Sequence, residues 1–342
     1  MVKRRTFLQA AITAVATVPF RASAQSAAAA RQTRIMHMKQ QPVTFDSAGL
    51  KLAGILHMPE GNASAPRPAI IVGHPASSVK EQTAGLYARR LAEQGFITLA
   101  FDTATQGESE GQPRGVEDPA RRIEEFRNAV SFLSVQQGID PDRIGVLGVC
   151  AAFGYAIPAA ATDHRIKAVA SVSGFDVGAQ FRVGADGKQD PAVLQHILGM
   201  VSAARTAEAR GEGIGTLPLF PANEAEARAG GRHLFEGWEY YCTDRAQHPR
   251  SAKTFTLNSL DRLATFDPVR FVGMIAPRPL LMIVGTEAVT KWVAEDAFRK
   301  AGGPKELFWI DGATHVDLYD KPKYVTPASA KLGDFFRSHL GA

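Results

Sequence analysis

A cysteine between very small residues is the first feature of this sequence with a clear chemical use. Cys150 stands in Gly148-Val149-Cys150-Ala151-Ala152, after a buried-strand pattern over residues 143–147 and before a run of small residues. A nucleophile at a sharp strand-to-helix turn needs small neighbours two positions before and after it, because the two backbones crowd there. Gly148 and Ala152 meet this need. The pattern predicts a nucleophile elbow, and its thiol indicates acyl transfer through a thioester.

A histidine near the C-terminus has the placement of a general base. His315 ends the segment Gly312-Ala313-Thr314-His315, which follows an expected strand over residues 306–310. An imidazole can take a thiol proton near neutral pH. We therefore expect His315 to shuttle protons for Cys150. Seven histidines have no comparable placement: His37, His57, His164, His196, His233, His248 and His339.

The elements that must position these residues alternate between strands and helices. After a hairpin over residues 43–58, buried-strand patterns cover 69–73, 96–101, 143–147, 166–172, 279–284 and 306–310. Helical patterns cover 82–94, the residues after Asp118-Pro119, the elbow helix to about 161, 292–301 and 328–340. This alternation predicts a mostly parallel, doubly wound sheet with helices on both faces.

The alternation breaks between residues 176 and 266. Helical patterns over 193–210 and 223–238 are separated by Gly211-Glu212-Gly213. This segment predicts a helical lid inserted between late strands of the sheet. Five aromatic residues in or near it are candidates for lining an acyl pocket or for packing: Phe175, Phe181, Trp238, Tyr240 and Tyr241.

The chain resembles the α/β-hydrolase superfamily over about residues 43–340. The resemblance rests on the elbow, on His74 after the 69–73 strand, on the 102–109 loop and on the 312–315 segment, which come in the right order. Within the superfamily the chain is most similar to the cysteine-nucleophile branch. That branch holds dienelactone-hydrolase-like enzymes and polyketide-transferase-type relatives with a helical lid. The resemblance implies a triad in the order nucleophile, acid, histidine.

The acid of that triad has two candidates. The resemblance places it shortly after the strand ending at Gly285, where the expected slot holds Val289 and the turn's one carboxylate is Glu287. Asp176 is the alternative, because some relatives take their acid from the position after the preceding strand. A surface role for Glu287 is an equal alternative to a catalytic one. A Cys–His pair can work without a third member.

The resemblance also implies an oxyanion hole made of two backbone N–H groups. One belongs to Ala151, directly after the nucleophile, and the other to Ala76 in the loop after His74. Pro75 has no N–H, so the donor must follow it. We expect His74 to shape this pocket or to hydrogen-bond locally.

The N-terminus has the pattern of an export signal. Residues 1–24 contain Lys3-Arg4-Arg5, an apolar run over 10–18 that is too short to span a bilayer, and the small-residue end Ala22-Ser23-Ala24. We expect a twin-arginine signal peptide, a flexible segment over 25–41, a hydrolase core over 42–175 and 267–342, and a lid over 176–266. The predicted location is periplasmic or secreted, without a stable membrane anchor after processing.

The charge of the chain argues against nucleic acid as a partner. The formal net charge of +5 comes mostly from residues 1–24, which carry four basic and no acidic side chains. The remainder has nearly equal numbers of both signs, which does not favour binding to phosphates. The expected partner is a small-molecule acyl substrate, and the sequence indicates no particular oligomeric state.

Two cysteines leave one structural alternative for Cys150. In an oxidising compartment, Cys150 and Cys242 could form a disulfide instead of carrying chemistry. The elbow favours a free thiol, because it exposes the side chain toward a pocket.

Three functions fit these residues. The first is hydrolysis of esters, lactones or thioesters by Cys150 and His315. The second is acyl transfer by the same residues to an alcohol or amine. The third is a binding protein that kept the fold and lost the chemistry. No cofactor and no metal is expected, because the sequence has no dinucleotide-binding glycine motif and no metal-ligand spacing.

Overall fold

The computed structural model describes residues 38–60 and 65–341. The expected signal peptide and most of the expected flexible segment lie outside the described residues. Residues 38–41 correct one boundary. They were expected to be flexible, and they form the start of β1 (Met38–Ser47), paired with the end of β2 (Leu50–Pro59).

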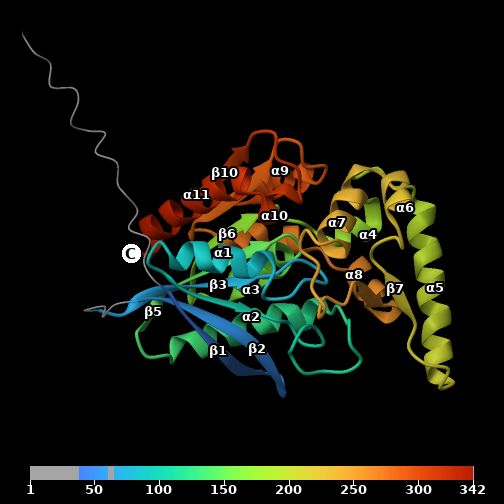
Figure 1. Cartoon of the computed structure of the whole chain (residues 1–342), viewed down its shortest axis with the longest axis horizontal. Coiled ribbons are helices and arrows are strands. Elements are labelled where there is room, and N and C mark those ends of the chain that lie inside the picture. The colour runs from blue at the N-terminus through green and yellow to red at the C-terminus, as the bar shows by residue number, and fades with distance from the viewer. Residues whose placement is uncertain (1–37, 61–64, 342) are drawn as a thin grey trace, which may run out of the picture. The chain divides into compact units, whose positions relative to one another are not determined.

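An eight-stranded sheet forms the centre of the fold, in the order β1-β2-β4-β3-β5-β6-β9-β10 (Figure 1). The β1–β2 and β2–β4 pairs are antiparallel, and every later pair is parallel. Buried apolar runs make the central strands, as expected for a sheet covered on both faces. The remaining strands are β3 (Arg67–Gly73), β4 (Ile97–Phe101), β5 (Ile139–Val149), β6 (Ile166–Val172), β9 (Leu280–Gly285) and β10 (Lys305–Ile310).

Helices cover both faces of this sheet. On one face α1 (Thr83–Ala92) packs against α11 (Pro322–Leu340). On the other face α2 (Pro119–Ser134), α3 (Ala152–Thr162), the 3₁₀ segment η2 (Pro268–Ile275) and α9 (Lys291–Lys300) pack in sequence. The Asp118 carboxylate caps α2 by accepting from the amides of Ala120 and Arg121. The predicted doubly wound α/β architecture is confirmed.

The insertion between β6 and β9 is the predicted lid. Its helices are α4 (Val177–Val183), α5 (Pro191–Ala209), α6 (Glu224–Ala229), α7 (Arg232–Cys242) and α8 (Leu260–Ala264), preceded by the short 3₁₀ turn η1 (Leu257–Ser259). The lid also contains an unpredicted two-stranded ribbon, β7 (Thr216–Pro218) with β8 (Thr254–Thr256). The helix expected over 223–238 is two helices, because Gly231 at φ +94° interrupts it.

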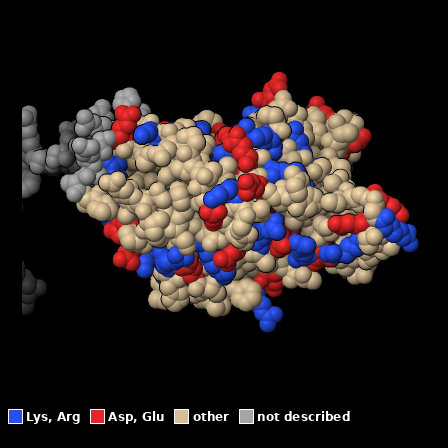
Figure 2. Space-filling view, turned by 90° about the horizontal axis from the view of Figure 1, so that it is seen from below, with Lys and Arg blue, Asp and Glu red and all other residues tan. Residues whose placement is uncertain are grey.

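On the face of the molecule seen in Figure 2, Lys and Arg lie next to Asp and Glu wherever charged side chains gather, and a broad area between them is uncharged. Among the described residues, no helix combines the length and hydrophobicity needed to cross a bilayer.

Candidate active site

The sharp turn between β5 and α3 holds Cys150 in a left-handed backbone conformation, at φ +53°. Its carbonyl accepts hydrogen bonds from the amides of Phe153 and Phe175, at 3.0 and 3.1 Å. A Cβ atom on Gly148 would lie 2.5 Å from the backbone nitrogen of Phe153, so only glycine fits there. The predicted elbow geometry is present, and a non-glycine residue at positive φ is typical of a strained functional turn.

Strand register brings the parts of the site to one edge of the sheet. Gly73 of β3 pairs with Gly148 of β5, so the loop after β3 lies beside the elbow. Ile310 of β10 pairs with Gly285 of β9, so the turns that follow these two strands also lie side by side. This edge holds the carboxyl ends of the parallel strands, where α/β folds place their ligands.

Two backbone amides face the Cys150 thiol. The N–H groups of Ala151 and Ala76 both hydrogen-bond to the sulfur, so the two residues predicted as oxyanion donors lie together beside Cys150. Ala151 begins the turn into α3, and Ala76 follows Pro75 in the loop after β3. Donors that already face the nucleophile lie close to the position where a carbonyl oxygen would become negative.

His74 lies behind this loop and does not line the cavity, so of its two expected roles the structure shows the local hydrogen bonding. Its side chain is fully buried, its Nδ1 is 2.7 Å from the Pro75 carbonyl oxygen, and its Nε2 accepts from the Thr103 amide at 3.4 Å. Burial, together with the nearby Arg122 and Lys80 charges, lowers its pKa to about 3. A neutral His74 therefore fixes the loop that carries Ala76.

A buried ionic network lies beneath the same loop. The Arg122 guanidinium donates to the Glu117 carboxylate at 3.1 Å and to the His74 carbonyl at 3.4 Å. The Tyr155 hydroxyl of α3 donates to Glu117 at 2.6 Å, and Arg122 lies over the Tyr155 ring. These contacts tie the oxyanion loop to the elbow helix.

Two hydroxyl groups hold the predicted base, His315. Its Nδ1 lies 2.6 Å from Thr290 Oγ1, and its Nε2 lies 3.0 Å from the hydroxyl of Tyr319. Burial, and secondarily the neighbouring His233, holds the pKa of His315 well below its usual value, so the ring is neutral at pH 7. In the tautomer that leaves Nε2 free to accept a proton, Nδ1–H donates to Thr290.

Neither predicted acid contacts His315, and this corrects the expected carboxylate triad. Glu287 is on the surface, with 56% of its side chain exposed, and its ion pair is with Arg232 at 3.6 Å. Asp176 caps α4 by accepting from the Ala179 amide and lies 3.7 Å from Arg182. Val289, in the expected acid slot, is exposed, and the next residue, Thr290, reaches the imidazole instead.

Tyr319 lies between the two residues expected to do the chemistry. It belongs to α10 (Asp317–Asp320), one turn after His315, and its hydroxyl also hydrogen-bonds to the Cys150 thiol. The ring is buried, with Tyr240 packed edge-on at 5.1 Å between centroids. The hydroxyl therefore bridges the Cys150 sulfur and His315 Nε2.

Both ends of this chain of hydrogen bonds are uncharged at rest. Burial raises the pKa of Cys150 to about 11, more than its hydrogen bonds to Tyr319, Ala151 and Ala76 lower it. Cys150 as a whole residue is only 8% exposed. A neutral thiol and a neutral imidazole form no ion pair, so the proton must move during attack. Cys150 and Cys242 are both free, so the alternative disulfide is absent from the structure.

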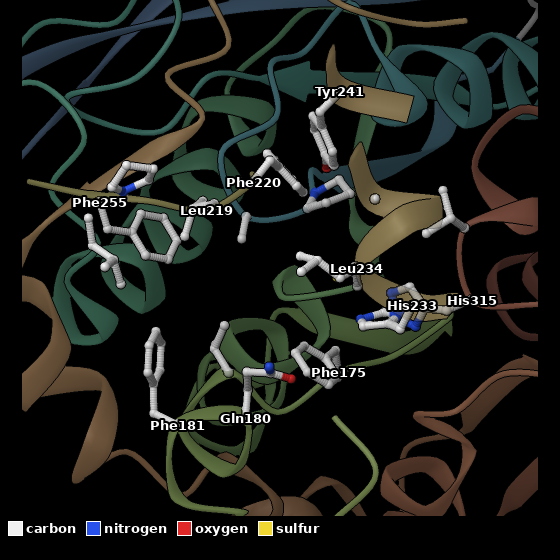
Figure 3. A pocket seen from close by; sticks show the side chains of 18 of the residues that line it. Phe175, Gln180, Phe181, Leu219, Phe220, His233, Leu234, Tyr241, Phe255 and His315 are labelled. Carbon is white, nitrogen blue, oxygen red and sulfur yellow. The ribbon is translucent and has the colours of Figure 1, made fainter. Parts of the chain in front are cut away.

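An apolar cavity of about 340 Å³ opens between this edge of the sheet and the lid, and Cys150, His315 and Tyr319 form part of its wall (Figure 3). Three of the five aromatic candidates line it, namely Phe175, Phe181 and Tyr241, whereas Trp238 and Tyr240 do not. The apolar lid residues that complete the wall are Val177, Ile197, Leu217, Leu219, Phe220, Leu234 and Phe255.

A second, more polar cavity of about 800 Å³ adjoins the first. The two share Gln180, Gln189 and His233 in their walls. The second is lined by charged side chains of both signs, among them Arg232 and Glu287. A substrate could therefore place an apolar part against Cys150 and a polar part on the other side of the shared residues.

Comparison with known proteins gives the family. The dienelactone hydrolase family model matches residues 52–197. Protein YcjY of Escherichia coli K12 is 35% identical over 308 residues, which cover 89% of this chain and all of YcjY. The chain belongs to the dienelactone hydrolase family.

One related sequence and one related crystal structure are similar to this family member over most of their length. A thiohydrolase, aneE of Aspergillus aculeatus, is 30% identical over 79% of this chain and 84% of its own length. The crystal structure of the hypothetical protein PA2218 from Pseudomonas aeruginosa superposes with a TM-score of 0.83 at 33% identity, covering 90% of this chain and 97% of that one. The α/β-hydrolase fold is thus shared over nearly the whole described chain.

Sequence reasoning missed four residues of this dienelactone hydrolase family site. Thr290 and Tyr319 received no role, and Gln180 and His233 were not among the candidates. Tyr319 follows His315 by only four residues, and this closeness along the chain is a usable signal. The other three depend on how the lid and the β9 turn fold back, which a pattern along the chain does not contain.

The neutral state of the Cys150 thiol predicts how the rate of its alkylation depends on pH. In a Cys242→Ala variant, the rate of Cys150 alkylation by iodoacetamide should rise about tenfold per pH unit up to at least pH 10, since only the thiolate reacts and its fraction grows until the pKa of about 11. Stopped samples analysed by intact mass would give the rates. A plateau below pH 8 would contradict the neutral resting pair and indicate a thiolate–imidazolium pair.

Proposed function

We propose that this protein hydrolyses carboxylic esters, lactones or thioesters through a covalent acyl-enzyme on Cys150. The observation that carries the proposal is the position of the thiol. It lies between two backbone N–H donors and the Tyr319–His315 hydrogen-bond chain, in the wall of an apolar cavity. Nucleophile, oxyanion donors and base are the three parts that acyl transfer requires.

In the first step the sulfur attacks the substrate carbonyl carbon. The thiol proton passes to the Tyr319 oxygen while the Tyr319 proton passes to His315 Nε2, which becomes an imidazolium. The carbonyl π pair moves onto oxygen, where the Ala76 and Ala151 amides stabilise the charge. Thr290 accepts from Nδ1–H throughout and keeps the imidazole in the productive orientation.

Collapse of this intermediate breaks the bond to the leaving group. The leaving alcohol or thiol takes a proton returned from Nε2 through Tyr319, and the acyl group stays on Cys150 as a thioester. Water then attacks the thioester with His315 as base, and the carboxylic acid departs as the thiol is restored. Two similar barriers replace one larger barrier, which is the benefit of a covalent intermediate.

Trapping the acyl-enzyme tests this proposal. A panel of activated esters, lactones and thioesters would be mixed with the protein, quenched in acid within the first turnover, and analysed by intact mass and peptide mapping. We expect a mass increase equal to the acyl group, located on the Cys150 peptide. Turnover of a panel member with acyl groups only on other residues, or with none at any time point, would overturn the covalent role of Cys150.

Acyl transfer is the second candidate function, because a polar cavity adjoins the apolar one and could hold an acceptor. An alcohol or amine would then replace water in the second step. Adding such acceptors during turnover and separating the products distinguishes the two. Ester or amide products in excess of free acid would favour transfer.

A further inference from the structure

Two polar side chains in the wall that the apolar and the polar cavity share lack hydrogen-bond partners. The Gln180 Oε1 atom and the His233 Nδ1 atom are both buried and unpaired, and within residues 38–60 and 65–341 neither side chain forms any hydrogen bond. Gln180 comes from α4 and His233 from α7, so two separate lid helices supply them. A buried polar group without a partner destabilises a folded protein, so such a group in a native structure requires an explanation.

Gln180 and His233 lie close to His315, the proposed base. The His233 ring packs edge-on against the His315 ring, with 5.2 Å between centroids. In Figure 3 the Gln180 amide is directed toward Phe175 and toward the two histidines. Both residues line the apolar cavity and the polar one, so they mark the junction between them.

We propose that Gln180 and His233 form a polar subsite that binds an uncharged hydrogen-bonding group of the substrate, a hydroxyl or a secondary amide, close to the reacting carbonyl. The proposal rests on the hydrolase function above and specifies its substrate class. The glutamine oxygen can only accept, so the substrate group must carry an O–H or N–H.

The protonation state of His233 determines which charge the substrate group can carry. Burial lowers the pKa of His233 to about 4, so its ring is neutral at pH 7 and presents one donor and one acceptor nitrogen. Two uncharged partners favour an uncharged ligand group over a carboxylate or an ammonium, because neither Gln180 nor neutral His233 carries a charge that would offset one. The surrounding Phe175, Phe181 and Leu234 favour an apolar chain beside that polar group.

Matched substrates test the subsite and separate the two sources of the polar group. One series carries a hydroxyl at C2, C3 or C4 of an octanoyl thioester, against plain octanoyl. The other series keeps the plain octanoyl group and varies the leaving group of the thioester. It compares N-acetylcysteamine, which carries a secondary amide, with a hydrocarbon thiol of equal length. We expect one polar member to exceed its plain partner by about 10- to 100-fold in kcat/KM, the range for pairing a buried polar group.

Gln180→Leu should reduce that preference to near unity, and Gln189→Leu is the matched control. Gln189 lines both cavities as well, but its amide already donates to the Phe181 carbonyl at 3.0 Å, so its loss should leave the preference intact. Independently of activity, Gln180→Leu should raise the Tm of the free protein, because an unpaired polar group leaves apolar surroundings.

The outcomes keep this inference separate from the proposed function. Cys150-dependent hydrolysis with equal kcat/KM for polar and plain substrates would overturn the subsite and leave the hydrolase function standing. A preference that survives Gln180→Leu would also overturn it. Absence of Cys150-dependent turnover for every member would overturn the proposed function, and a raised Tm for Gln180→Leu would then still report an unpaired glutamine.

Discussion

Replacing Cys150 with alanine is expected to lower kcat/KM for the best ester or thioester by about 10⁴-fold or more. Removing the nucleophile of an acyl-transfer enzyme leaves only what the oxyanion donors and substrate binding supply, which is a small fraction of the rate. The expected loss is in kcat, because the sulfur contributes little to holding the ground state. Steady-state kinetics on purified variants, with circular dichroism to verify folding, measures it.

Cys242→Ala is the control for this prediction. Cys242 lies at the end of α7, is half-buried, and is not in the wall of the cavity. We expect kcat and KM of that variant to stay within about twofold of wild type, as for most changes away from a site. If Cys150→Ala kept a tenth or more of the activity, another residue would have to be the nucleophile.

Replacing Tyr319 with phenylalanine is expected to lower kcat by about 10²- to 10³-fold with little change in KM. The substitution keeps the ring but removes the hydroxyl that connects the Cys150 thiol to His315 Nε2. Proton transfer by a positioned group contributes about 10²- to 10⁴-fold, so loss of the connecting group should fall in this range.

A proton inventory in mixed H₂O and D₂O distinguishes a relay from packing. Wild type should show two protons in flight during acylation and a curved inventory, whereas Tyr319→Phe should show at most one. Tyr240→Phe is the matched control, because its ring packs on Tyr319 while its hydroxyl bonds to the Thr83 backbone and not to Cys150. Unchanged or faster turnover by Tyr319→Phe would mean that the hydroxyl only separates Cys150 from His315.

The sequence identified the parts of the site that depend on local geometry. The elbow could be predicted because Gly148 and Ala152 flank Cys150 at fixed offsets, and the crowding at that turn is local. The position of His315 in the cavity wall could be predicted because His315 follows the last strand. The alternation of apolar runs and helical spacing likewise predicts the sheet and its covering helices.

The partner of His315 could not be predicted in the same way. The expectation of a carboxylate came from the order of residues along the chain, and the turn after β9 contained only Glu287. In the folded turn the Glu287 side chain lies at the surface, and the side chain of Thr290, three residues later, contacts the His315 ring. Which residue of the turn contacts the ring depends on the direction of each side chain. The lid residues depend on contacts between segments far apart in sequence, for which no local pattern exists.

The neutral state of Cys150 has a consequence for chemical durability. Peroxides and low-molecular-weight disulfides attack thiolates far faster than thiols, and a thiol whose pKa is about 11 is almost entirely protonated at pH 7. In the mechanism we propose, Cys150 becomes reactive only when a bound carbonyl draws the thiol proton toward His315. If Cys150 acts as we propose, the protein should keep its activity at oxidant concentrations that inactivate a cysteine hydrolase with a preformed thiolate.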